Sequence, residues 1–205
     1  MNKIMKKAKQ SITNQKKKYL FLTTILIVGI ISGIIFIFFI SKEDKSLVKT
    51  ELDTFFNHIK MNQINYLSVF KNSFFTNLLY LFIFWVLGIS IIGVPIILFL
   101  LFFKGFIFGF NFSSIITNYG LKGILPGIFY QFPHHLLLLI FFVMISFYAI
   151  NFSVRLFRVL FLKENINLTQ CFKRYNQIGI ICVIGILLCS IFETFVMPIL
   201  MNLFL

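Results

Sequence analysis

The chain has 205 residues, of which 59% are hydrophobic and only 12% are charged, and its mean hydropathy is +0.95. This composition excludes an ordinary soluble globular domain, and at about 20 apolar residues per crossing of a ~30 Å hydrocarbon core the length allows five spans. The net charge of +13 could suggest nucleic acid, but the basic residues cluster at the ends of apolar runs, where anionic headgroups would hold them. We therefore predict an all-α, polytopic membrane bundle in one domain, residues 1–205, with membrane lipids and no nucleic acid as partners.

The N-terminal end predicts how the chain is oriented. Residues 1–18 contain seven lysines and no acid, and the 22 residues from Tyr19 to Ile40 carry no charge. Because cytoplasmic segments are enriched in Lys and Arg, the first span should start in the cytoplasm and exit on the outer side. No small-residue cleavage site follows this apolar run, so we expect it to be retained as an anchor.

Residues 41–73 are expected to form an amphipathic segment outside the cytoplasm. This segment has five lysines against four acids. Four of its apolar residues recur at helical spacing: Val48, Leu52, Phe55 and Ile59. Asp53 and His58 lie five residues apart and so on different faces of a helix, which predicts solvated side chains rather than ligands.

The second and third spans should form a tight hairpin. Span two is expected at Phe74–Gly93, and Val94-Pro95 follows at once, which suits the first turn of a new helix. Span three should then run to about Thr117. The turn between them would lie on the cytoplasmic side, because two crossings return the chain to the side where it began.

The segment 118–131 is interrupted by Gly and Pro, and lipid cannot hydrogen-bond an exposed backbone, so we expect it to lie outside or to be re-entrant. Span four should cover about Phe132–Ser153. Residues 154–177 carry five basic residues against one acid, a balance of +4 that predicts a cytoplasmic loop. Span five, Ile178–Met201, would leave the C-terminus outside.

Catalytic motifs are missing from the sequence. The outward segments contain no HExxH, no GxSxG elbow and no thiol, and the cytoplasmic loop contains no phosphate-binding glycine loop. We predict no enzymatic activity, no cofactor and no metal site, and we expect the three cysteines to pack as small hydrophobic residues. His134 and His135 follow Pro133 at the outer end of span four, where histidines commonly reach toward the headgroups; a functional histidine is the alternative.

Two ionisable residues stand deep inside the predicted spans. Lys104 lies nine residues beyond Pro95, about 14 Å along a helix, and Glu193 lies roughly 15 residues into span five. Intramembrane charges usually face the bundle interior and find a partner, so we hypothesise that Lys104 and Glu193 pair. The alternative is that Lys104 reaches toward the cytoplasmic interface because the hairpin begins later than Pro95.

Two GxxxG pairs indicate close helix packing: Gly29 with Gly33 in span one, and Gly105 with Gly109 in span three. Small residues at this spacing let helix backbones approach each other where no hydrophobic force drives association. The spacing predicts a contact for each pair but does not identify its partner.

Three stretches together resemble the stage II sporulation protein M family: the run KGFIFGF from Lys104 to Phe110, Leu125-Pro126, and Phe132-Pro133. The order of parts is similar over most of the chain, from the basic N-terminal tail to the last span. The spacing of the two prolines, seven residues apart, is the most specific feature of the resemblance.

The chain departs from the wider family between these prolines. Many members carry a histidine right after the first proline and a glutamate two residues before the second, where this chain has Gly127 and Gln131. The departure argues against an acid-dependent role for the segment and fits the endospore-former branch of the family.

The resemblance implies a non-enzymatic membrane scaffold for stage II sporulation proteins D and P, which cleave peptidoglycan during engulfment of the forespore. We hypothesise that these hydrolases dock on spans one to three and on the outward segment, through the stripe Val48, Leu52, Phe55 and Ile59. The ordinary alternative is that this stripe lies on the membrane surface. A homo-oligomer is compatible with either reading.

A permease-like subunit that works with a separate ATPase is the second functional hypothesis. Broken membrane segments beside buried charges are typical of transporters, but the chain shows no convincing internal repeat. Neighbouring sporulation genes would favour the scaffold, and a neighbouring ATPase gene would favour transport. A third class, an intramembrane enzyme, lacks the paired acids, histidines or serine that it would need in adjacent spans.

Overall fold

The computed structural model of the protein describes residues 2–61 and 65–202, and within them the side chains of residues 15–59, 61, 65–120 and 133–200. Every regular element in these ranges is helical. The elements are α1 (Asn2–Phe36), α2 (Lys42–Lys60), α3 (Tyr66–Ile89), α4 (Gly93–Tyr119), α5 (Leu121–Leu162), α6 (Leu168–Ile191), the π-helix η1 (Phe192–Val196) and α7 (Met197–Asn202).

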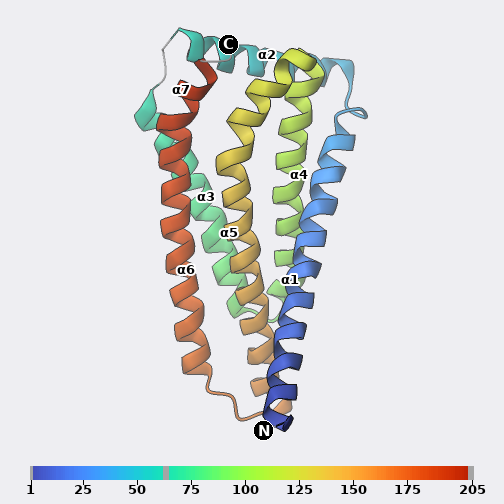
Figure 1. Cartoon of the computed structure of the whole chain (residues 1–205), viewed down its shortest axis with the longest axis vertical. Helices are drawn as coiled ribbons and strands as arrows, with labels where there is room; N and C mark the ends of the chain where they lie inside the picture. The colour runs from blue at the N-terminus through green and yellow to red at the C-terminus, as the bar shows by residue number, and fades with distance from the viewer. Residues whose placement is uncertain (1, 62–64, 203–205) are drawn as a thin grey trace.

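Five helical stretches are long and apolar enough to cross a membrane: Gln15–Phe36, Tyr66–Ile89, Gly93–Tyr119, Pro133–Phe161 and Leu168–Leu200. The predicted all-α fold with five spans is confirmed. The elements α6, η1 and α7 follow one another without a break and together supply the fifth span. With five lengthwise helical stretches, the start of α1 and the end of α7 lie at opposite ends of the bundle (Figure 1).

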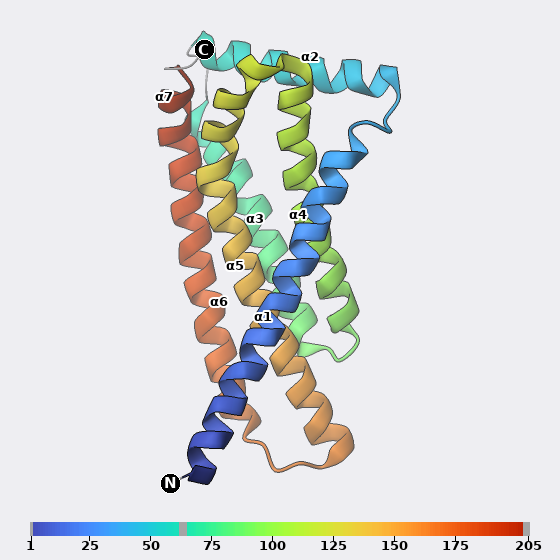
Figure 2. The ribbon, with the colours of Figure 1, turned by 45° about the vertical axis from the view of Figure 1, so that its right-hand side comes forward.

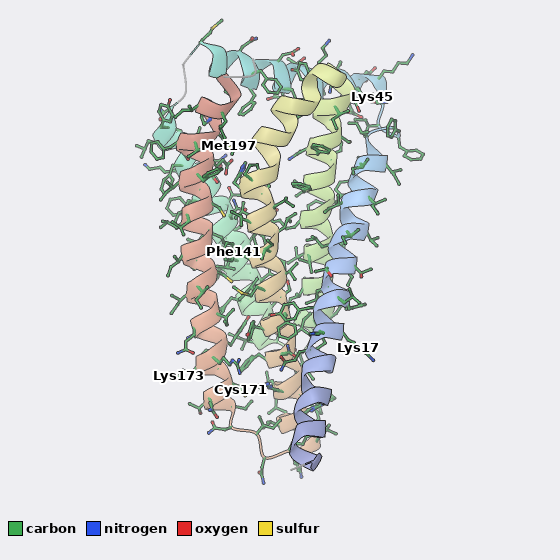
Figure 3. All side chains as sticks on the ribbon, in the orientation of Figure 1. Lys17, Lys45, Phe141, Cys171, Lys173 and Met197 are labelled. Carbon is green, nitrogen blue, oxygen red and sulfur yellow. The ribbon has the colours of Figure 1, made fainter. Side chains whose placement is uncertain are left out.

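One helix lies across the bundle that the others form. The helices α1 and α3 to α6 run along the long axis, whereas α2 lies across one end in both views (Figure 1 and Figure 2). The start of α1 and the α5–α6 connection lie at the opposite end. Accordingly, Lys17 and Lys173 lie in the half of the molecule away from α2, and Lys45 lies on α2 (Figure 3). The basic N-terminal segment and the basic segment 154–177 therefore share one end of the bundle. The predicted loop 154–177 is itself helical except for residues 163–167, because α5 and α6 extend into it.

Span two begins earlier than the sequence predicts, at Tyr66 instead of Phe74. Asn65 caps this helix, because its side chain accepts a hydrogen bond from the backbone N–H of Ser68. Such a cap satisfies one of the free amides of the first turn, so the helix can start among polar residues. The predicted outward segment 41–73 is thus two elements, α2 and the first turns of α3.

The segment 118–131 is helical, where the sequence predicts a broken or re-entrant stretch. α4 ends directly before Gly120, and α5 begins at Leu121 and continues through Pro126 and Pro133. Gly120 has a φ of 58°, a left-handed conformation that costs glycine little, so a single residue reverses the chain. Each proline removes one backbone donor from α5, and the first turns of α5 are inclined to the rest (Figure 1).

The backbones of α1 and α4 are in direct contact where these helices cross. The glycines of the two GxxxG pairs line the crossing: Gly29, Gly33, Gly105 and Gly109. A Cβ atom added at Gly33 would lie 2.1 Å from the carbonyl oxygen of Phe106, and one added at Gly109 would lie 2.1 Å from that of Ile30. Any larger residue would force the two helices apart. The structure therefore brings the two glycine pairs together as partners.

Large apolar side chains fill the interior between α3, α4, α5 and α6. Five of them are at most 1% exposed: Phe84, Ile97, Leu101, Phe142 and Ile145. Cys182 and Cys189 are buried in the same core as free thiols. This core occupies the middle of the bundle and separates its two polar ends.

Candidate functional site

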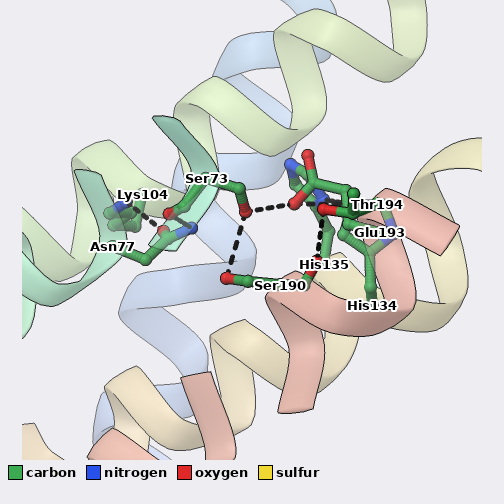
Figure 4. A network of polar contacts seen from close by, with 8 residues as sticks. All are labelled: Ser73, Asn77, Lys104, His134, His135, Ser190, Glu193 and Thr194. Atoms are coloured by element: carbon green, nitrogen blue, oxygen red, sulfur yellow. Dashed lines mark hydrogen bonds and ion pairs between the residues drawn. The ribbon is translucent and has the colours of Figure 1, made fainter. Parts of the chain in front are cut away.

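A chain of polar side chains crosses the bundle interior between its middle and its α2 end (Figure 4). Its members are Lys104 of α4, Asn77 and Ser73 of α3, Ser190 of α6, Glu193 of η1, and His134 and His135 of α5. We call this set the polar network. Four helices contribute to it, so it forms only when the bundle is assembled.

Lys104 is half-buried near the middle of the 27-residue helix α4. Its Nζ atom lies 3.3 Å from Oδ1 of Asn77, to which it donates. The same ammonium lies 3.6 Å from the ring centroid of Tyr80 and 4.7 Å from that of Phe142. Aromatic faces attract a cation electrostatically, so the charge is held by an amide and two rings inside the bundle. This geometry contradicts the alternative prediction, in which Lys104 reaches toward the cytoplasmic interface of the membrane.

Glu193 is the acidic member of the network and lies on the π-helix η1. Its Oε2 atom accepts a hydrogen bond of 2.5 Å from the hydroxyl of Ser73, whose oxygen also lies 3.2 Å from that of Ser190. Single-turn π-helices occur often at functional sites, because the extra residue per turn changes which side chains face inward. Here the wider turn brings a carboxylate to the bundle interior, beside buried Thr194.

The predicted direct pair of Lys104 and Glu193 is wrong. Lys104 donates to Asn77, Glu193 accepts from Ser73, and these two partners lie one turn apart on α3. Asn77 also donates from Nδ2 to the backbone oxygen of Ser73, at 3.0 Å. The two charges are therefore joined through the polar edge of α3. The sequence prediction puts Asn77 in span two and Ser73 at the end of the outward segment, and places neither between the charges.

His134 and His135 complete the polar network on the side of α5. His134 is 0% exposed, and its Nε2 atom lies 3.8 Å from Oε2 of Glu193. The Nδ1 atom of His135 faces Nε2 of His134 at 2.5 Å. Neutral imidazole has one donor and one acceptor nitrogen, so the two rings can share a proton between them. The expectation that these histidines reach toward the headgroups is wrong for His134, which points into the bundle beside Glu193.

The polar network reaches a cavity of about 490 Å³ beneath α2. Glu193 and His135 line this cavity together with Asn111 and Ser114 of α4. The remaining wall includes the α2 residues Leu47, Val48, Glu51, Leu52, Phe55 and Phe56. The network is therefore reached from the α2 end of the molecule.

The apolar core closes the network toward the opposite end. Phe84 of α3 and Phe142 and Ile145 of α5 follow the network residues of their own helices in the direction away from α2, and all are at most 1% exposed. Beyond them, the buried hydroxyl of Tyr175 donates to the backbone oxygen of Trp85 at 2.9 Å. In the described part of the chain the network thus has access from one side.

The stripe proposed for docking faces the protein's own bundle. Ile59 is 3% exposed and packs with Phe56 against Ile115 of α4, and Leu52 and Phe55 lie partly buried on the same cluster. Val48 is also partly buried. The apolar side of α2 is therefore used to hold this helix across the end of the bundle, which removes most of the stripe as a free surface.

Asp53 adds a polar contact between α2 and the bundle. Its Oδ1 atom accepts a hydrogen bond of 2.5 Å from the hydroxyl of Tyr119, the last residue of α4. The prediction of a solvated Asp53 is thus wrong, whereas His58 is exposed as expected. Spacing within one helix separates these two residues correctly but cannot show that a tyrosine from another helix reaches one of them.

Sequence reasoning found the two charged ends of the polar network and missed its middle. Ser73 and Asn77 are ordinary polar residues near the start of a span, and no pattern sets them apart. His134 did carry a signal, because an ionisable residue within a membrane span usually faces the bundle interior. Among the described residues, no three His, Cys, Asp or Glu side chains are arranged to hold a metal ion.

Comparison with known protein families assigns the chain to one of them. Residues 20–198 match the family Stage II sporulation protein M, and the chain belongs to this family. No curated protein and no solved structure gives a significant match. The protein is thus a helical membrane protein of a sporulation family.

Proposed function

We propose that this member of the stage II sporulation protein M family is a non-enzymatic scaffold in the bacterial cell membrane. It would hold the peptidoglycan hydrolases stage II sporulation proteins D and P beside their substrate during engulfment of the forespore. Family membership over residues 20–198 is the observation that carries this proposal. A chain without hydrolytic groups can act in this way, because confining partners to the membrane raises their effective concentration.

The charge distribution supports an orientation with α2 on the wall side. Residues 1–18 and 154–177 carry most of the basic residues and lie at one end of the bundle. Because cytoplasmic ends of membrane proteins are enriched in Lys and Arg, this end would face the cytoplasm. The helix α2, at the other end, would then face the compartment in which cell-wall hydrolases work.

The outer face of α2 is the docking surface that we propose in place of the apolar stripe. Five exposed residues recur along it at helical spacing: Glu43, Ser46, Thr50, Thr54 and Asn57. The apolar stripe on the opposite side fixes α2 on the bundle, so this polar face is presented in a defined orientation. A preorganised surface loses less conformational entropy when a partner binds.

Affinity purification from sporulating cells tests the proposal. The wild-type chain should recover proteins D and P, and Thr50→Arg with Thr54→Arg should reduce that recovery by about tenfold or more, because two large cations would stand in the interface. The matched control is Asn165→Arg with Thr169→Arg, an equal charge change at exposed positions of the opposite end. Undiminished recovery with the α2 variant would contradict docking there, and absence of both hydrolases from the wild-type sample would contradict the scaffold itself.

A permease-like subunit remains the second candidate, and the polar network is the observation that favours it. Buried ionisable groups commonly line proton or ion paths. The closed core of Phe84, Phe142 and Ile145 opposes it for a single copy in this conformation. Proton flux into liposomes that contain the purified chain, abolished by Glu193→Gln, would establish the permease; the scaffold predicts equal leakage with and without the protein.

A further inference from the structure

A second cavity, of about 480 Å³, lies at the end of the bundle opposite α2, between α5 and α6. It is lined by Arg155, Gln170, Cys171, Lys173, Arg174 and Gln177. Three of these six side chains are cations and two are neutral amides, so the lining offers hydrogen-bond donors and positive charge. A lining of this kind is suited to an anion with several acceptor oxygens.

Arg155 is held at this cavity by a contact between the two helices. Its Nη1 atom lies 3.0 Å from Sγ of Cys171, to which it donates a weak hydrogen bond. Arg155, Cys171 and Arg174 also line a smaller adjoining cavity of about 80 Å³, whose wall includes Gln15 of α1 and Asn151 of α5. Three helices therefore meet around these two guanidinium groups, and the basic surface is part of the bundle and not of a single loop.

The cations of this cavity have no acidic partner in the structure. Among the described side chains, no carboxylate lies within 4.0 Å of Arg155, Lys173 or Arg174. Further positive charge is close by, because Lys18 lies within electrostatic range of both Arg158 and Arg155. A concentration of like charge is unfavourable by itself and is relieved when an anion binds.

Exposed apolar residues lie on the same two helices as the cavity, close in sequence to its lining residues. Phe172 of α6 is 37% exposed and Phe157 of α5 is 41% exposed. Both positions lie within candidate membrane spans, Pro133–Phe161 and Leu168–Leu200. A molecule with an anionic head and apolar tails could thus place its head in the cavity while its tails follow the helices.

We propose that this cavity binds the phosphate group of an anionic phospholipid. Phosphate accepts several hydrogen bonds at once, which the fork of a guanidinium group and the amides of Gln170 and Gln177 can donate. Basic pockets between membrane helices on the cytoplasmic side are a known means of holding lipid headgroups. Soluble phosphate compounds share this chemistry but lack acyl chains that could contact the nearby apolar side chains.

Native mass spectrometry of the full-length, detergent-purified chain tests the lipid site. Titration with phosphatidylglycerol should give a saturable one-to-one complex, and phosphatidylcholine, which has no net charge, should bind much more weakly. Arg155→Gln with Arg174→Gln should weaken phosphatidylglycerol binding by about 20- to 30-fold, since each cation near an anionic headgroup contributes about fivefold. Excess inorganic phosphate should not displace the lipid.

The matched control is Lys42→Gln with Lys49→Gln, which removes the same charge from exposed positions on α2. An equal loss of binding in this control would overturn the site in favour of general charge attraction. Displacement by inorganic phosphate at the concentration of the lipid would instead identify a soluble phosphate compound as the ligand. Should the double variant unfold, the exposed residue Lys173 gives a milder test, because Lys173→Gln should still weaken binding about fivefold.

Discussion

Helices α1 and α3 both pack against α4, but the two contacts are built in opposite ways. The contact with α1 depends on Gly105 and Gly109, which leave room for a neighbouring backbone. The contact with α3 includes Lys104, whose ammonium group donates to Asn77 and lies over the ring of Tyr80. Lys104 and Gly105 are consecutive residues, so one turn of α4 presents a close-packing surface to one neighbour and a buried cation to another.

The contact between α1 and α4 stabilises the fold, whereas the contact between α4 and α3 places a charged group inside it. A contact between glycines requires only the absence of side chains and stabilises association at no cost in desolvation. A buried ammonium loses its hydration, and the aromatic rings and the amide return only part of that energy. Packing alone therefore accounts for the α1–α4 contact, whereas the polar network is better explained by function than by stability.

The largest loss of stability is expected from Gly109→Ala. The new Cβ atom would lie 2.1 Å from the carbonyl oxygen of Ile30, and a backbone cannot rotate away as a side chain can. We expect the free energy of unfolding to fall by about 3 kcal/mol, measured by thermal or denaturant unfolding in detergent. Gly179→Ala is the matched control, because its Cβ would meet Trp85 at an ordinary 3.5 Å. Equal effects of the two substitutions would show that close packing does not hold α1 on α4.

Ser73→Ala should cost less, about 2 kcal/mol, because it removes the hydroxyl that donates to the partly buried carboxylate of Glu193. The same unfolding measurement applies. In the control Ser46→Ala the lost hydroxyl is exposed and bonds only to its own helix, at the oxygen of Glu43, so we expect a change within about 0.5 kcal/mol. An unchanged free energy of unfolding in Ser73→Ala would mean that water replaces the serine hydroxyl and that the polar network is open to solvent.

Tyr119→Phe should have a smaller and more local effect, about 1 kcal/mol. It removes the hydroxyl that donates to Asp53 and so loosens α2 from the bundle end without changing any span. Hydrogen exchange of the α2 amides should become faster while exchange in α4 stays the same. Tyr66→Phe, at an exposed tyrosine, is the control. Unchanged protection of α2 would assign its attachment to Phe56 and Ile59 alone.

The smallest change in stability is expected from Lys104→Met, within about 1 kcal/mol of the wild type or more stable, because an apolar side chain of similar length removes a desolvated charge. Engulfment in sporulating cells that carry this variant should nevertheless be impaired, if the polar network serves the function. A loss of more than about 3 kcal/mol would instead make Lys104 a structural residue and would remove the contrast with the α1–α4 contact.

How far the sequence predicts these features depends on whether a pattern lies within one helix or between several. The five spans and the GxxxG spacing are properties of single helices, so hydropathy and residue spacing predict them. That the pair Gly29 and Gly33 meets the pair Gly105 and Gly109 depends on the order in which helices pack, which neither pattern contains. The structure is needed to join them.

The polar network shows the same limit more sharply. The depth of Lys104 and Glu193 within their spans correctly suggests that both face the interior, but depth alone cannot show that Ser73 and Asn77 stand between them. The early start of α3 was missed for a different, local reason: Ser68 and Lys71 lower the hydropathy of its first turns, while the cap at Asn65 that begins the helix is a single hydrogen bond.

The separation of charge along the bundle makes the protein responsive to the membrane potential. The four acids of α2 are balanced by four lysines of the same helix, whereas the N-terminal lysines and the segment 154–177 give the far end a large positive net charge. A cell interior that is electrically negative attracts this cationic end. In the orientation that we propose, each charge that would have to cross an inverted bundle adds about 2.3 kcal/mol per 100 mV, so an energised membrane would itself help to keep α2 on the outer side.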